Sequence, residues 1–346
     1  MANVKPLRKR TAVLLIVVGV LFFVLYLLFF VPFEEFSSAF QRANPIYYSI
    51  AFGALTLSVF FAALTWHFFL RILSIESRLL KAFQFIWVGY FVDLLIPAES
   101  LSSDISKIYL MSKQSGASTG KVAASVIAHR ILATIISFSG LVISSIYFLL
   151  RYQPSPFLRG FIALTVGVSM FFLGAMLYFS TKRKATERIV NWTVNFAERV
   201  SRGRWNLENL KLRAMRILEA FHEGILTLGM RPSSLVFPVA SAILAWFFDM
   251  LIVVLVFLSL GALGTGISFS VIVIVYFIIV GIEDAPLVIP ASVGIMEIAM
   301  TSLYTLFGVS IGLSAVVTVL IRAITFWVRL LIGGLVVQWL GIKGLA

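Results

Sequence analysis

The 346-residue sequence contains no cysteine, only three histidines and few charged residues, which make up 12% of the chain. The absence of cysteine excludes disulfide bonds, thiolate metal sites and cysteine nucleophiles. The histidines, His67, His129 and His222, are scattered along the chain. We therefore expect no metal site and no cofactor. Sequence motifs for zinc peptidases, nucleotide-binding loops, hydrolase elbows and paired-aspartate metal sites are also missing, so no catalytic signature is present.

The chain also lacks the polar surface that a soluble domain needs, because 60% of its residues are hydrophobic. Long stretches with almost no charge apart from arginines occur at 12–33, 46–70, 122–150, 161–180, 233–260 and 313–341. Each has about 20 residues or more, enough to cross a hydrocarbon core of about 30 Å. We predict an all-α, multi-pass protein of the cell membrane.

The formal net charge of +13 has a simpler explanation than binding to nucleic acid, which we do not expect. Basic residues collect in the cytoplasmic loops of membrane proteins. Here they cluster at the N-terminus and in segment 181–231, which contains eleven of them. Both regions are therefore predicted to be cytoplasmic.

Segment 181–231 has apolar residues at helical spacing, for example Ile189, Trp192 and Phe196. This pattern predicts a cytoplasmic insertion of two amphipathic helices that lie on the inner membrane surface, with their basic faces near anionic lipid. Docking of a partner protein on these helices is the alternative, and a homo-oligomer is compatible with the sequence.

Two parts of the chain repeat each other. "LIPAES" (95–100) resembles "VIPASV" (288–293), and each breaks an apolar run with a proline, Pro97 or Pro290. Further on, "GASTGKVAASVIAHR" aligns with "GVSIGLSAVVTVLIR" at a constant offset of 192, so that Arg130 coincides with Arg322. These matches indicate a single membrane domain built from two repeats, 12–150 and 158–341.

Each repeat is predicted to contain two spans, a proline-broken pair and a long span that carries an arginine. The predicted segments are 12–33, 46–73, 79–97, 98–115 and 121–150, then 158–180, 233–261, 268–290, 291–308 and 313–341. If each broken pair enters and leaves the membrane from one face, each repeat crosses three times and the second copy is inverted. The fold would then have about six full spans plus two re-entrant hairpins, although 268–290 is long enough to span completely.

Proline breaks beside charged residues indicate a polar chamber within the membrane, because irregular backbone at that depth faces protein or water. A charge there costs about 2.5–3.5 kcal/mol on insertion scales and normally faces the interior of the bundle. The predicted substrate-binding residues are Arg130, Arg322, Arg329, Lys107, Asp93, Asp104, Glu283, Asp284 and Glu297. Glu99 and Asp249 are further candidate partners for the arginines. The alternative is that these charges only pair with each other and hold the two halves together.

Three short motifs resemble those of a known family. "SDISKIY" (103–109) is similar to its Gly-Glu-x-x-Arg-x-Tyr motif, "HR" (129–130) stands in place of Glu-Arg, and "PASVGIME" (290–297) matches Pro-x-Ser-x-Gly-x-x-Glu. Over essentially its whole length the sequence resembles the transmembrane, flippase-like region of lysylphosphatidylglycerol synthases. We expect a stand-alone member without a synthase domain. The resemblance implies movement of a lipid with a charged or glycosylated headgroup between leaflets.

The leading functional hypothesis is therefore a flippase-like transporter whose partner is a membrane lipid, with Arg130 and Arg322 holding the headgroup. Two other classes stay open. One is a membrane enzyme or accessory subunit acting on a lipid-linked phosphate or sugar, with Asp104 or Glu297 as acid or base. The other is a non-catalytic scaffold that docks partners through 181–231.

Overall fold

The computed structural model describes residues 37–38, 41, 43–95, 101–200, 208–230, 232–262, 268–284 and 294–341. This part of the chain is helical and contains no strand, as predicted. Three predicted features lie outside the described residues: the first span at 12–33, the two hairpin prolines Pro97 and Pro290, and Glu99.

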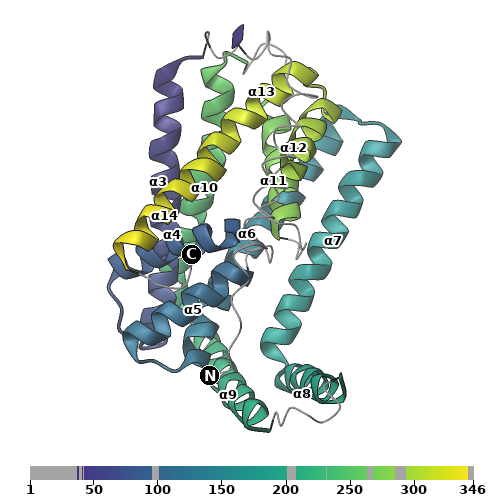
Figure 1. Cartoon of the computed structure of the whole chain (residues 1–346). Coiled ribbons are helices and arrows are strands. Elements are labelled where there is room, and N and C mark those ends of the chain that lie inside the picture. The colour runs from purple at the N-terminus through teal and green to yellow at the C-terminus, as the bar shows by residue number, and fades with distance from the viewer. Residues whose placement is uncertain are drawn as a thin grey trace.

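The helices agree with the predicted segments to within a few residues (Figure 1). The first half contains α3 (Pro45–Ile72), α4 (Leu79–Leu95), α5 (Leu101–Ser115), α6 (Thr119–Tyr152) and α7 (Pro156–Thr181). The amphipathic segment forms α8 (Arg183–Val200) and α9 (Glu208–Gly229), and the second half contains a short 3₁₀ turn η1 (Pro232–Leu235), α10 (Val236–Ser259), α11 (Phe269–Asp284), α12 (Ile295–Leu306), α13 (Ile311–Arg322), η3 (Ala323–Val328) and α14 (Arg329–Trp339).

Five helices within the described residues are long and apolar enough to cross a membrane. They are Pro45–Ile72, Thr119–Tyr152, Pro156–Thr181, Ser233–Ser259 and Ile311–Trp339. The protein is therefore a multi-pass membrane protein. In the last span, the two α-helical parts α13 and α14 are joined by η3, which is a π-helix.

Local sequence sets the ends of the first of these helices. Asn44 accepts a hydrogen bond from the backbone N–H of Ile46 at 2.9 Å, and Pro45 occupies the first turn, where a missing N–H costs nothing. The helix ends before Ser74, which has a left-handed backbone (φ 55°). A face of small residues, including Ala51, Ala54 and Ala63, is fully buried. Small side chains let a neighbouring helix approach closely.

Helices α3 and α10 pack along each other more extensively than any other pair of described helices. Thr65 on α3 donates a hydrogen bond to the hydroxyl of Ser241 on α10 at 2.9 Å. The rings of Phe61 and Phe248 stack with centroids 5.6 Å apart. Because these two helices hold matching places in the predicted repeats, their contact joins the two halves of the chain.

The helices on either side of each predicted hairpin break are short. Helix α4 has 17 residues and α11 has 16, so each is roughly 25 Å long and shorter than a hydrocarbon core of about 30 Å. Figure 1 shows α4 and α5 in the lower half of the molecule and α11 and α12 in the upper half. The two pairs therefore occupy opposite ends of the bundle.

Each of these pairs also packs against the other half of the chain. Helix α11 contacts α6, and α4 contacts α14. A glycine marks each crossing: a Cβ added at Gly140 would overlap the ring of Phe277, and one at Gly333 would lie 2.8 Å from the Cβ of Phe91. The two halves are therefore interlocked at close range.

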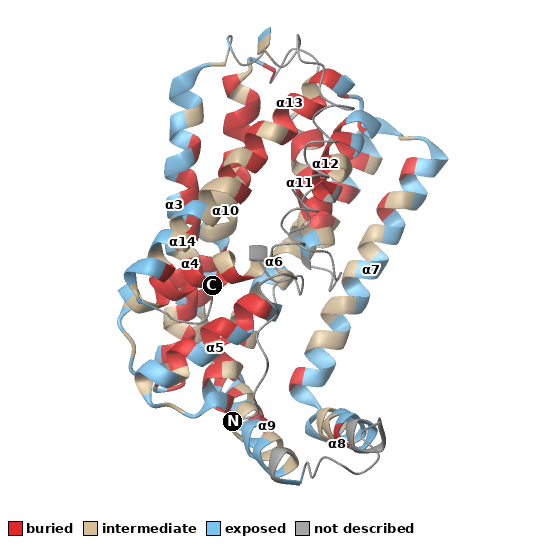
Figure 2. Ribbon diagram, in the orientation of Figure 1, coloured by how far each residue is buried: buried red, intermediate tan, exposed pale blue. Residues whose placement is uncertain are grey.

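Helices α7, α8 and α9 lie outside this core. Figure 2 shows that α7 is mostly exposed or partly exposed, whereas α11 and the C-terminal half of α10 are largely buried. Helix α8 leaves Ile189, Trp192 and Phe196 exposed. The apolar face of α9, in contrast, packs against α6, because Gly224 lies directly against Ala124 there. The predicted amphipathic helices are present, and one of them already has a protein partner for its apolar face.

Candidate functional site

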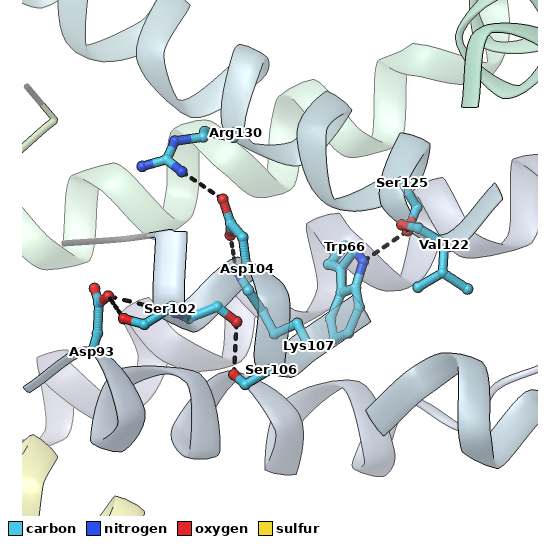
Figure 3. A network of polar contacts seen from close by, with 10 residues as sticks. Trp66, Asp93, Ser102, Asp104, Ser106, Lys107, Val122, Ser125 and Arg130 are labelled. Atoms are coloured by element: carbon cyan, nitrogen blue, oxygen red, sulfur yellow. Dashed lines mark hydrogen bonds and ion pairs between the residues drawn. The ribbon is translucent and has the colours of Figure 1, made fainter. Parts of the chain in front are cut away.

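The first cluster of charges joins α5 to α6 (Figure 3). Asp104, in the first turn of α5, forms an ion pair with Arg130 of α6 (Nη1–Oδ2, 2.5 Å) and another with Lys107 one turn later (Nζ–Oδ1, 2.8 Å). Asp104 and Lys107 are buried, and the Arg130 side chain is 18% exposed. One carboxylate thus holds two cations, at a helix N-terminus that itself favours negative charge.

Asp93 ties the end of α4 to the start of α5. It accepts hydrogen bonds from the hydroxyl of Ser102 at 2.6 Å and from the backbone N–H of Ser103 at 3.4 Å. Figure 3 shows these bonds beside the Asp104 cluster. Asp93 therefore fixes the local geometry where α4 ends and α5 begins.

The second cluster joins α12 to α13 and is more enclosed. Glu297 forms an ion pair with Arg322 (Nε–Oε1, 2.7 Å), and the side chains are 1% and 8% exposed. The other carboxylate oxygen accepts a hydrogen bond from the backbone N–H of Gly294 at 2.5 Å. Gly294 has φ +86°, which only glycine adopts readily. This capping geometry explains the Gly-x-x-Glu spacing in "PASVGIME".

The third cluster joins α10 to α14. Asp249 forms an ion pair with Arg329 (Oδ1–Nη2, 2.7 Å) and accepts a hydrogen bond from Tyr276 of α11 at 3.1 Å. The guanidinium of Arg329 also lies over the ring of Tyr90 on α4, 4.8 Å from its centroid. Asp249 was predicted only as a candidate partner and not as a substrate-binding residue. Its sequence signal is that it is the one charge in the apolar stretch 233–260.

A small polar cavity of about 60 Å³ lies between the second and third clusters. Its lining includes Arg322, Arg329, Asp249, Glu283, Tyr304 and Thr325. Two buried guanidinium nitrogens, Nη2 of Arg322 and Nε of Arg329, have no hydrogen-bond partner in the structure. The π-helix lies between these two arginines, and such segments are frequent at functional sites. Two of the residues that line the cavity therefore each keep an unused donor.

The structure thus gives each predicted arginine a carboxylate partner. Arg130, Arg322 and Arg329 pair with Asp104, Glu297 and Asp249. Glu283 lines the cavity and is exposed on α11, and Asp284 is the last residue of that helix. The cavity brings Arg322 and Arg329 together, whereas Arg130 is not among its lining residues. Among the described residues, no group of three or more His, Asp or Glu could hold a metal ion.

The sequence of the chain matches a known protein family. Residues 16–333 match the family described as the lysylphosphatidylglycerol synthase TM region. The chain belongs to this family. The matched range includes all three charged clusters.

Two similar relatives of the chain are UPF0104 membrane proteins. One, from Methanothermobacter thermautotrophicus, is 28% identical over 333 residues and covers 96% of both chains. The other, from Pyrococcus horikoshii, is 27% identical over 331 residues, which are 94% of this chain and 96% of the relative. The chain and these relatives have matching lengths, so the similarity extends over the whole membrane domain.

Proposed function

We propose that this protein is a flippase-like transporter that moves a lipid with a charged or glycosylated headgroup between leaflets. The observation that supports it best is the polar cavity inside the bundle, where two buried guanidinium groups keep unpaired donors. A buried donor without a partner costs about 1–3 kcal/mol. A phosphate oxygen or sugar hydroxyl that accepts these bonds would recover that free energy, and the planar guanidinium fork suits phosphate.

The proposal includes two inverted repeats, and the packing supports this. The ion pairs Asp104–Arg130 and Glu297–Arg322 join residues separated by 26 and 25 positions, at corresponding places in the two halves. Helix α6 crosses α11 as α14 crosses α4. The short helices α4 and α11 fit hairpins that dip into the membrane from opposite faces, where inverted-repeat transporters place their substrate sites.

The ion pairs supply a mechanism for binding and release. A cavity of about 60 Å³ has room for a few water molecules, since each needs at least about 10–15 Å³. A lipid headgroup is larger, so the helices around Arg322 and Arg329 must separate before it enters. The headgroup then competes with Glu297 and Asp249 for the arginines. Rocking one repeat against the other would expose the site to each leaflet in turn, while the acyl chains stay in lipid.

The orientation in the membrane is part of the proposal. The eleven basic residues of 181–231 favour a cytoplasmic position for α8 and α9. Exposed Trp192 and Phe196, whose rings stack 5.6 Å apart on α8, fit contact with the inner leaflet of a cell membrane.

Reconstitution into liposomes tests the function. Fluorescently labelled lipids with anionic, zwitterionic and glycosylated headgroups are incorporated, and their exposure to a membrane-impermeant quencher is followed over time. We expect movement of at least one headgroup class. For Arg322→Lys, which keeps the charge but loses the guanidinium fork, the rate of lipid movement should be about tenfold or more lower. Arg71→Gln, an exposed change at the end of α3, is the matched control and should leave the rate unchanged. Absence of movement for every headgroup would refute the proposal.

A further inference from the structure

A large apolar groove lies between α6, α10 and α11, apart from the three charged clusters. Its volume is about 750 Å³. This lies within the range of roughly 300–1,000 Å³ that is typical of sites for small molecules. Apolar side chains make up most of its walls, including Ile135, Ile136 and Ile143 on α6, Ile243 on α10, and Val273 and Phe277 on α11.

A glycine and two aromatic rings form part of the groove wall. Gly140 of α6 has no side chain where Phe277 approaches, and a Cβ at that position would overlap the ring. The ring of Phe277 stacks on Trp246 of α10, with centroids 5.1 Å apart and planes 14° apart. The indole Nε1 of Trp246 is buried and has no hydrogen-bond partner in the structure.

One end of the groove is polar. Ser270 donates a hydrogen bond to the hydroxyl of Tyr152 at 3.0 Å, and the hydroxyls of Ser268 and Ser270 are 2.8 Å apart. Tyr152 is the last residue of the membrane-spanning α6, and tyrosine is enriched at the headgroup level. The groove continues to Ile135, roughly 25 Å away along the helix. A long apolar groove with hydroxyls at its interfacial end matches the shape and polarity of a single lipid molecule.

We propose that this groove binds one hydrocarbon chain of a membrane lipid, with the polar part of that lipid at Tyr152, Ser268 and Ser270. The occupant follows from the surroundings, because α6 and α10 are membrane spans and lipid chains are the medium beside them. This lipid site is distinct from the proposed headgroup site at Arg322 and Arg329. It stays in place whether or not the protein moves other lipids.

Retention of lipid after purification tests this inference. The full chain is washed extensively in detergent, and the remaining lipid is counted by native mass spectrometry. We expect about one lipid per chain in the wild type. Ser139→Trp and Ile143→Trp, which place an indole in the groove, should each lower retention about tenfold or more. Ile146→Trp is the control, because Ile146 is exposed on the same helix and is not among the lining residues. Its retention should equal that of the wild type.

A second measurement avoids variants that fail to fold. The chain has no cysteine, so Ile143→Cys and Ile146→Cys each introduce a single small thiol without filling the groove. A small membrane-permeant maleimide should react with the thiol at 143 about tenfold more slowly in protein that retains one lipid per chain than in delipidated protein, and with the thiol at 146 at the same rate in both. Equal protection of the two thiols by lipid would overturn the proposal, as would equal retention in all variants or none in the wild type. Lipid movement is a separate readout, and its absence would count against the proposed function alone.

Discussion

At the scale of single residues, the main feature is that arginines deep in apolar helices are each paired with a carboxylate. The pairs differ in how far water is excluded. Glu297 and Arg322 are the most enclosed, with side chains 1% and 8% exposed, whereas the Arg130 side chain is 18% exposed. Removing one partner of a buried pair leaves an uncompensated charge, which costs about 3–5 kcal/mol. The pairs should therefore differ in their effect on stability.

Glu297→Gln should destabilise the protein by about 3–5 kcal/mol, because it leaves the Arg322 charge without its carboxylate and weakens the bond to Gly294. Asp104→Asn should have a smaller effect, since the Arg130 side chain is less enclosed, at 18% exposed. Thermal unfolding in detergent measures both.

Glu187→Gln on α8 is the control. Arg183 donates to Glu187 at 2.7 Å, and this hydrogen bond raises the pKa of the arginine, yet the pair is exposed. Its loss should leave the unfolding temperature nearly unchanged. An effect as large as that of Glu297→Gln would show that enclosure is not what sets the strength of these pairs.

At the scale of helices, the two halves of the chain depend on close approach at glycines. Gly140 lets α11 lie against α6, and Gly333 lets α4 lie against α14. Glycine lowers the intrinsic stability of a helix by about 1 kcal/mol relative to alanine. At these crossings glycine is nevertheless required, because a larger residue would push the paired helices apart.

Gly140→Ala should therefore destabilise the protein, although alanine favours helix. Gly167→Ala on α7 is the matched control, because no atom lies within 4 Å of its added Cβ, and it should be neutral or slightly stabilising. Thermal unfolding compares the two. In a double-mutant cycle, Phe277→Ala should cost less stability in the Gly140→Ala background than in the wild type, because it removes the clash together with the ring. Equal effects of both glycine substitutions would contradict the close packing of α6 on α11.

At the scale of the whole molecule, the proposed inverted arrangement determines which loops share a side of the membrane. A hairpin that enters and leaves from one face keeps both of its ends on that face. The start of α4 and the end of α5 should lie on one side of the membrane, and the start of α11 and the end of α12 on the other. A full crossing by either pair would separate its ends.

Single cysteines in this cysteine-free chain test the arrangement. In sealed vesicles, an impermeant maleimide should label Arg78→Cys and Gln114→Cys from the cytoplasmic side, together with Lys184→Cys on α8. Phe269→Cys and Ser310→Cys should react from the opposite side. All five positions are exposed, so none is shielded by the packing of the protein itself. Reaction of Arg78→Cys and Gln114→Cys from different sides would rule out the first hairpin.

The positions of most helices follow from the sequence, because the hydrocarbon of a membrane offers the backbone no hydrogen-bond partners. Apolar stretches of sufficient length must be helical, as every backbone polar group needs a partner within the segment. The predicted segments 121–150 and 158–180 accordingly appear as Thr119–Tyr152 and Pro156–Thr181. The cost of charge in hydrocarbon also identified Arg130, Arg322 and Arg329 as residues that face the interior.

The partner of each arginine was decided by tertiary structure. Several carboxylates were available to each, and nothing in their spacing along the chain distinguishes Asp249, which lies 80 positions before Arg329. The cavity that joins Arg322 to Arg329, the π-helix between them and the groove beside Gly140 likewise depend on how helices distant in sequence cross. Hydropathy sets which segments enter the membrane, whereas packing between their side chains sets which faces meet.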